Sequence, residues 1–160
     1  ACAGPLPRNV ESALLLQPAI NGYCFSADVA GQGFPGGYRS ALEVVRQPIL
    51  STFSKHDVPL TKLFHLALRR KTDLGEIRIA ATPPSRYAAL GGFGPQGCPA
   101  PECRYVDILT PAEAYDLDPA NGPKVYGVNG DAHIDGHSGI VNEATAWALY
   151  NQVRATEPNP

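Results

Sequence analysis

The chain has 160 residues, of which 44% are hydrophobic and 18% are charged, and its formal net charge is −2 at pH 7. This composition is typical of a globular protein with a sizeable core, and it excludes the basic surplus expected of a protein that binds nucleic acid or an anionic membrane. No apolar run approaches the length of a membrane span, and no signal peptide is visible. We therefore expect a cytoplasmic protein without nucleic-acid partners.

The first part of the chain predicts strands that alternate with helices. Residues 11–20, ESALLLQPAI, contain a short apolar run that is typical of a strand buried on both faces. A glycine-rich loop and a short helix over residues 38–46 lead to a second buried strand over residues 48–53. After Pro59, apolar residues recur at helical spacing, which predicts a helix over residues 60–70.

The second part begins with the least regular stretch, residues 71–123, which we interpret as a loop-rich insertion. Within it, IRIAA favours a short strand, and Thr110 followed by Pro111 favours a turn of helix. The sequence KVYGVNG at residues 124–130 predicts a third buried strand. An amphipathic helix with the single tryptophan is then predicted from residue 141 to residue 153.

Strands alternating with helices predict one α/β domain over residues 1–160 with a mostly parallel sheet. In such a sheet, functional groups gather at the carboxyl ends of the strands. Two strand ends carry polar groups. The first is followed by Ser54, Lys55, His56 and Asp57, and the second by Asp131, His133, Asp135 and His137. A carboxylate from one corner is therefore expected to meet an imidazole from the other, to orient the ring and to stabilise its protonated form.

The order of these corners resembles the carboxyl-terminal half of an α/β-hydrolase. In that family the catalytic acid follows the seventh strand and the histidine follows the eighth. QPILSTFSKHDVPL is similar to the acid corner, and GVNGDAHIDGHSGIVNEATAWAL is similar to the histidine loop and last helix. The resemblance covers roughly the whole chain. It implies that Asp57 and His137 are catalytic and that ESALLLQPAI is the sixth strand of a partial, doubly wound sheet.

The resemblance also implies a serine hydrolase that needs no cofactor and acts on a small-molecule ester, amide or related acyl substrate. The family's G-x-S-x-G nucleophile elbow does not occur in this sequence, and Ser138 in GHSGI lacks the second glycine. We therefore expect the nucleophile and the oxyanion hole in a missing amino-terminal half of the same protein. The chain alone is expected to be an inactive fragment.

The residues leave alternatives open at both catalytic positions. Asp57 lies eighty positions before His137, and Asp28 is a possible substitute for the acid. His133 is a possible substitute for the histidine if the loop bends early. Asp57 also stands where a helix-capping residue is expected before Pro59, and capping and catalysis do not exclude each other.

A metal-dependent hydrolase is the second hypothesis. Because Asp131, His133, Asp135 and His137 alternate, an extended segment would place all four on one side, where they could hold zinc or another divalent ion. The third hypothesis is a non-enzymatic binding domain that grips a partner with Tyr87 and Phe93 in a glycine- and proline-rich loop. That loop is more simply interpreted as a cover over the catalytic edge of the sheet.

Two of the four cysteines, Cys98 and Cys103, lie in the loop sequence CPAPEC. A local disulfide is sterically possible between them, and two ordinary thiols are favoured because nothing indicates an oxidising compartment. A zinc site would need a second Cys/His pair at short spacing, and none follows.

Overall fold

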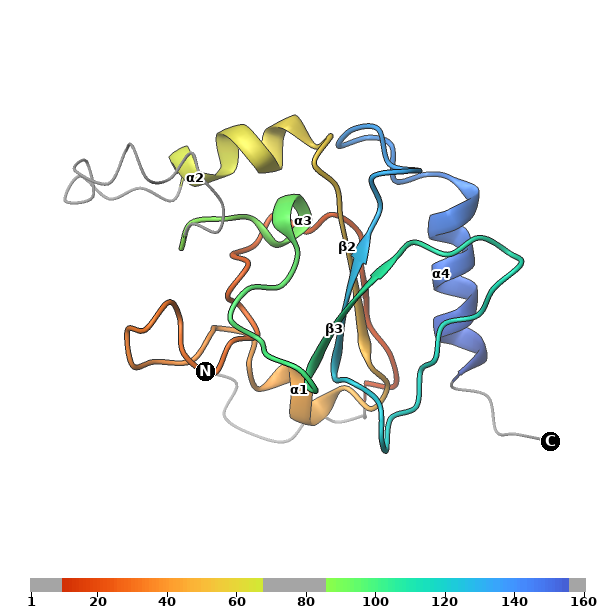
Figure 1. Cartoon of the computed structure of the whole chain (residues 1–160), viewed down its shortest axis with the longest axis horizontal. Coiled ribbons are helices and arrows are strands. Elements are labelled where there is room, and N and C mark those ends of the chain that lie inside the picture. Colours follow the sequence, from red (N-terminus) through yellow and green to blue (C-terminus); the bar gives the residue numbers. More distant parts are fainter. Residues whose placement is uncertain (1–9, 68–85, 156–160) are drawn as a thin grey trace.

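A four-stranded sheet, in the order β1-β2-β4-β3, forms the centre of the computed structural model, which describes residues 10–67 and 86–155 (Figure 1). The strands are β1 (Leu14–Leu15), β2 (Ile49–Phe53), β3 (Cys103–Asp107) and β4 (Val125–Asn129). All three neighbouring pairs are parallel. The prediction of a parallel α/β sheet is confirmed, with the three predicted strands as neighbours.

The helices are mostly short and lie around this sheet. They are α1 (Ala41–Val44), the π-helical turn η1 (Pro59–Leu63), α2 (Phe64–Ala67), α3 (Leu90–Phe93) and α4 (Glu143–Arg154). Figure 1 shows α4 along one side of the sheet, with α1 and α3 on the other side. None of the described helices is long and apolar enough to cross a membrane.

Both faces of the central strands β2 and β4 are buried, as parallel strands with helices on each side require. Leu50 and Tyr126 point toward α4 and pack in one cluster with Ala148. Their chain neighbours Ile49 and Val125 belong to the cluster on the opposite face. Because successive side chains of a strand alternate between faces, one apolar run fills both clusters. Burial of each large aliphatic side chain contributes about 1.5–3 kcal/mol.

The first predicted strand is shorter than the sequence suggests. Only Leu14 and Leu15 of residues 11–20 form a strand. The extended run stops at Gln17, whose φ of 41° places it in the left-handed region, and Pro18 follows. A proline cannot donate to a strand ladder, so pairing with β2 ends here.

The interpretation of residues 71–123 as a loop-rich insertion overlooked β3. This strand pairs with β4 over its whole length and forms one edge of the sheet. Its side chains do not alternate regularly between buried and exposed positions, and Arg104 is exposed. The sequence therefore lacks the alternating apolar pattern by which a strand is predicted. The predicted helical turn at Thr110 is a turn closed by the Glu113 N–H and the Thr110 carbonyl. The predicted strand IRIAA lies outside the described residues.

Candidate functional site

The acid corner is a tight turn that holds Asp57 rigidly at the carboxyl end of β2. The Asp57 side chain has no solvent exposure, and its Oδ1 accepts the N–H of Leu60 at 3.0 Å. The Asp57 carbonyl accepts both the N–H and the hydroxyl of Thr61, at 2.8 and 2.7 Å. Asp57 therefore has the capping contacts expected before Pro59, and its second carboxylate oxygen is left for another partner.

That partner is His137, which follows β4. Its Nδ1 lies 2.8 Å from Asp57 Oδ2, across eighty positions of sequence. The His137 side chain is 52% exposed whereas the carboxylate is fully buried. An ionised Asp57 carboxylate accepts a hydrogen bond from the N–H at Nδ1 of His137. In the neutral ring, this tautomer leaves a lone pair on Nε2. The pair thus has the contact expected from the sequence, together with an imidazole open on one side.

Two links between the corners hold the histidine loop against the acid turn. The buried Ser54 hydroxyl donates to the carbonyl of Ile134 at 2.7 Å. Lys55 binds Asp131 twice, with its N–H to Oδ1 at 2.8 Å and its Nζ to Oδ2 at 2.9 Å. Partial burial raises the pKa of Asp131, but the contacts with Lys55 outweigh it and leave that pKa below its ordinary value.

The far end of the histidine loop is fixed by the start of α4. Asn142 is the N-cap, and its Oδ1 accepts the N–H of Thr145 at 3.0 Å in a capping box. Its Nδ2 donates to the carbonyls of Gly139 and His133, at 2.7 and 3.0 Å. One side chain therefore connects the helix to both sides of His137.

The structure does not bring the two substitute residues to this pair. His133 is exposed, and the imidazole bonded to Asp57 is that of His137. Asp28 lies in the glycine-rich loop, where its Oδ1 accepts the N–H of Gly33 at 2.8 Å. Its carboxylate thus closes a local turn.

The histidine loop does not have the extended geometry that the metal hypothesis assumes. Residues 131–137 form turns instead of the extended segment that would align alternate side chains. Asp131 is engaged by Lys55 and His137 by Asp57. Among residues 10–67 and 86–155, no three His, Cys, Asp or Glu side chains are grouped so as to hold a metal ion.

The loop interpreted as a cover does lie beside the acid corner. Helix α3 contacts both β2 and η1, and the Gly91 carbonyl accepts the N–H of Ser54 at 3.1 Å. A Cβ on Gly91 would lie 2.4 Å from the carbonyl carbon of Gln17, so only glycine permits this approach.

Gln17 is a polar residue at this edge that sequence reasoning missed. It follows β1, its N–H donates to Thr52 Oγ1 at 2.9 Å, and it is only 3% exposed. Both of its side-chain amide atoms are buried without a hydrogen-bond partner. The only sequence signal is its place between a strand and a proline.

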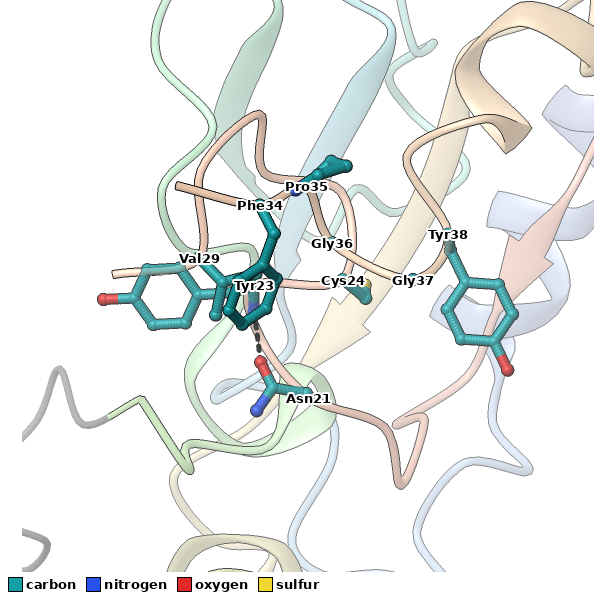
Figure 2. A pocket seen from close by; sticks show the side chains of 9 residues that line it. All are labelled: Asn21, Tyr23, Cys24, Val29, Phe34, Pro35, Gly36, Gly37 and Tyr38. Atoms are coloured by element: carbon teal, nitrogen blue, oxygen red, sulfur yellow. Dashed lines mark hydrogen bonds between the residues drawn. The ribbon is translucent and has the colours of Figure 1, made fainter. Parts of the chain in front are cut away.

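A separate pocket of about 300 Å³ lies in the glycine-rich loop (Figure 2). Figure 2 shows Phe34 pointing toward Asn21, whose Oδ1 accepts the N–H of Tyr23 at 2.8 Å, while Tyr38 points away on the other side. None of the residues that line it belongs to the two strand-end corners. Sequence reasoning missed this pocket, although three aromatic residues in a glycine-rich loop are a usable signal.

Family models, curated proteins and solved structures provide no significant match to this chain.

Proposed function

We propose that this chain supplies the acid and the histidine of a serine hydrolase of the α/β-hydrolase type, acting on an ester, an amide or a related acyl compound. The supporting observation is the 2.8 Å contact between His137 Nδ1 and the fully buried carboxylate of Asp57. Both residues follow adjacent parallel strands, so the sheet itself fixes their relation. A buried carboxylate behind a half-exposed imidazole is the arrangement that a general base requires.

In the proposed mechanism, a serine hydroxyl approaches the open side of His137. Nε2 takes the hydroxyl proton while the serine oxygen attacks the acyl carbon, and it then gives this proton to the leaving group. Asp57 keeps the ring in the required tautomer and stabilises the imidazolium. A water molecule, deprotonated by the same Nε2, then releases the acid product and regenerates the serine. No cofactor takes part in these steps.

The serine is expected to precede this chain. A G-x-S-x-G sequence that ends roughly fifteen to twenty-five residues before Ala1 would place the elbow beside β1. The coding sequence upstream of Ala1 tests this directly, and its translation product provides the protein for the kinetic test.

The kinetic test uses that extended protein, a fluorophosphonate probe for the serine and p-nitrophenyl esters as substrates. Asp57→Asn preserves the size of the buried side chain and is expected to lower kcat by about 10³–10⁴-fold, because the favoured imidazole tautomer changes. His137→Ala should cause a loss of similar size, and the double variant should be no worse than the more impaired single variant.

His133→Ala is the matched control and should leave kcat within about twofold, because the exposed ring of His133 is not the one bonded to Asp57. Loss of activity in His133→Ala but not in His137→Ala would show that the histidine is assigned wrongly. An extended protein that neither labels with the probe nor hydrolyses esters would overturn the proposed function.

A further inference from the structure

Three cysteines pack in one region on the α1 side of the sheet. Cys24 and Cys103 are buried members of the same apolar cluster, and the half-buried Cys98 packs against it. All three are free thiols.

The segment between Cys98 and Cys103 is a tight turn with both ends anchored. The Cys103 N–H donates to the carbonyl of Pro99 at 3.1 Å, which folds the turn back on itself. On one side, the Ser26 hydroxyl donates to the Gly97 carbonyl at 2.8 Å. On the other side, Cys103 is the first residue of β3. Cys98 packs against the apolar cluster to which Cys103 belongs, so the two thiols lie in one region of the turn.

Charged groups next to the turn are paired. Arg39 binds the Glu102 carboxylate with both guanidinium nitrogens, at 2.5 and 2.7 Å. Glu102 Oε2 also lies 3.6 Å from Cys98 Sγ. The ion pair holds Glu102 within the turn and thereby fixes the backbone between the two sulfurs.

The two thiols of the turn differ in reactivity. The interaction with the neighbouring Cys103 thiol lowers the pKa of Cys98 and outweighs the opposite effects of burial and of Glu102, while Arg39 adds to the lowering. The same interaction, together with burial, raises the pKa of Cys103. Burial raises the pKa of Cys24 to about 12. Cys98 is thus the thiol suited to initial attack.

We propose that Cys98 and Cys103 form a modification site, a dithiol that reacts with low-molecular-weight aliphatic disulfides and closes to a local disulfide. The site is independent of the hydrolase pair and does not rest on the proposed function. Its basis is a preformed turn whose two cysteines pack in one cluster, with Cys98 partly accessible and Cys103 sheltered at the start of a strand.

The chemistry balances as two thiol–disulfide exchanges. Cys98 Sγ, as thiolate, attacks one sulfur of the small disulfide, so that a mixed disulfide forms and one small thiolate leaves and takes up a proton. Cys103 then loses its proton to solvent and attacks Cys98 Sγ. This step forms the bond between the two cysteines and releases the second small thiol. Two protein thiols are oxidised and one small disulfide is reduced to two thiols.

The test is to incubate the reduced, folded chain with oxidised glutathione at about pH 8 and follow its intact mass and peptide map. Because Cys2 lies outside the described residues, a Cys2→Ser background simplifies the masses. We expect a loss of about 2 Da and a peptide that links Cys98 to Cys103. Cys103→Ser should stop at a glutathione adduct on Cys98, and Cys98→Ser should react at least about tenfold more slowly.

Cys24→Ser is the matched control, because it removes a buried thiol of the same cluster and should leave the 2 Da loss unchanged. The peptide map of the Cys2→Ser chain, which keeps Cys24, Cys98 and Cys103, decides the proposal even if a further variant fails to fold. A disulfide that includes Cys24 would overturn it, as would a folded chain that stays fully reduced while the urea-unfolded chain oxidises. Adduct formation on Cys98 without closure in that chain would also overturn it.

Discussion

At the scale of single residues, Gln17 is the most unusual side chain of the candidate edge. It combines a left-handed φ of 41° with an amide group that is buried and has no hydrogen-bond partner. A buried polar group without a partner costs about 1–3 kcal/mol. Natural chains tolerate such a cost where another requirement imposes it, and Gln17 lies at the sheet edge that carries Asp57.

We predict that Gln17→Met raises the free energy of unfolding of this chain by about 1–2 kcal/mol. Methionine has a similar length and removes the unpaired amide, while the backbone bond to Thr52 is retained. The measurement is urea unfolding, with a shifted midpoint and an unchanged slope.

Gln47→Met is the control for this substitution. Gln47 is equally buried, but its Nε2 donates to the Ala155 carbonyl at 2.8 Å, so the same change should destabilise the chain. A loss of stability in Gln17→Met as well would mean that the Gln17 amide has a partner in solution.

The residue scale also shows which parts of the site the sequence could predict. The contact between Asp57 and His137 was predictable because parallel strands bring their carboxyl ends to one edge. The burial of the Gln17 side chain and the double contact of Lys55 with Asp131 could not be predicted. Both depend on turn geometry that the spacing of residues in the sequence does not encode.

At the scale of elements, the histidine loop is held at both ends, and Asn142 is the more informative anchor. Asn142→Ala removes the cap of α4 and the two hydrogen bonds donated to the loop. We predict a loss of about 1–2 kcal/mol in the free energy of unfolding, measured in urea. Asn142→Asp keeps an acceptor for the cap but cannot donate to the loop carbonyls. Its free energy of unfolding should therefore lie between those of the natural chain and Asn142→Ala.

The control for the cap is Asn121→Ala. Asn121 donates only to Asp118 in an exposed turn, so its removal should change stability by less than about 0.5 kcal/mol. Equal losses in Asn142→Ala and Asn121→Ala would show that the capping box contributes nothing specific to the loop.

The link between Lys55 and Asp131 predicts a pH dependence. Because the pKa of Asp131 is lowered in the folded chain, its stabilisation is complete above the ordinary carboxyl pKa of 3.8. It is lost as the pH falls through the lowered folded value. Asp131→Asn should therefore be less stable than the natural chain by about 0.5–1 kcal/mol near pH 7, and the difference should shrink as the pH falls below 3.8 and through the lowered folded pKa.

Urea midpoints at a series of pH values measure this difference. Lys55→Met should reproduce the effect, whereas Lys62→Met, at an exposed position of η1, should not. A difference that persists or grows on acidification would contradict the assigned ion pair.

Among the elements, β3 shows why sequence periodicity failed in part of the chain. A central strand such as β4, VYGVN, is buried along almost its whole length, and its sequence is largely apolar. The edge strand β3 needs only one buried face and one paired side, and it carries Arg104 and Asp107. Its sequence therefore resembles a loop, although the backbone pairs with β4 throughout.

At the scale of the whole molecule, the two edges of the sheet differ. The β3 edge has a charged strand, whereas the β1 edge consists of Leu14 and Leu15. Beside β1 lies an apolar groove of about 290 Å³, with Ala13, Leu15, Pro18, Ile20, Phe25, Tyr38, Ala41, Val45 and Ile49 along its walls. In the proposed hydrolase, upstream strands would cover this edge. In the isolated chain, we expect the β1 edge and this groove to be contacted by a second copy.

We therefore predict that the isolated chain self-associates through the β1 edge. Size-exclusion chromatography with light scattering should show a mass that rises with concentration. Leu15→Lys places a charge in the groove and should lower the association constant by at least about tenfold, since burial of an unpaired ammonium is costly.

Val141→Lys, at a side chain that is 93% exposed in the histidine loop, adds the same charge elsewhere and should leave association unchanged. Circular dichroism of both variants separates loss of association from loss of folding. A chain that stays monomeric at every concentration, with the natural Leu15 in place, would show that the β1 edge is closed without upstream strands.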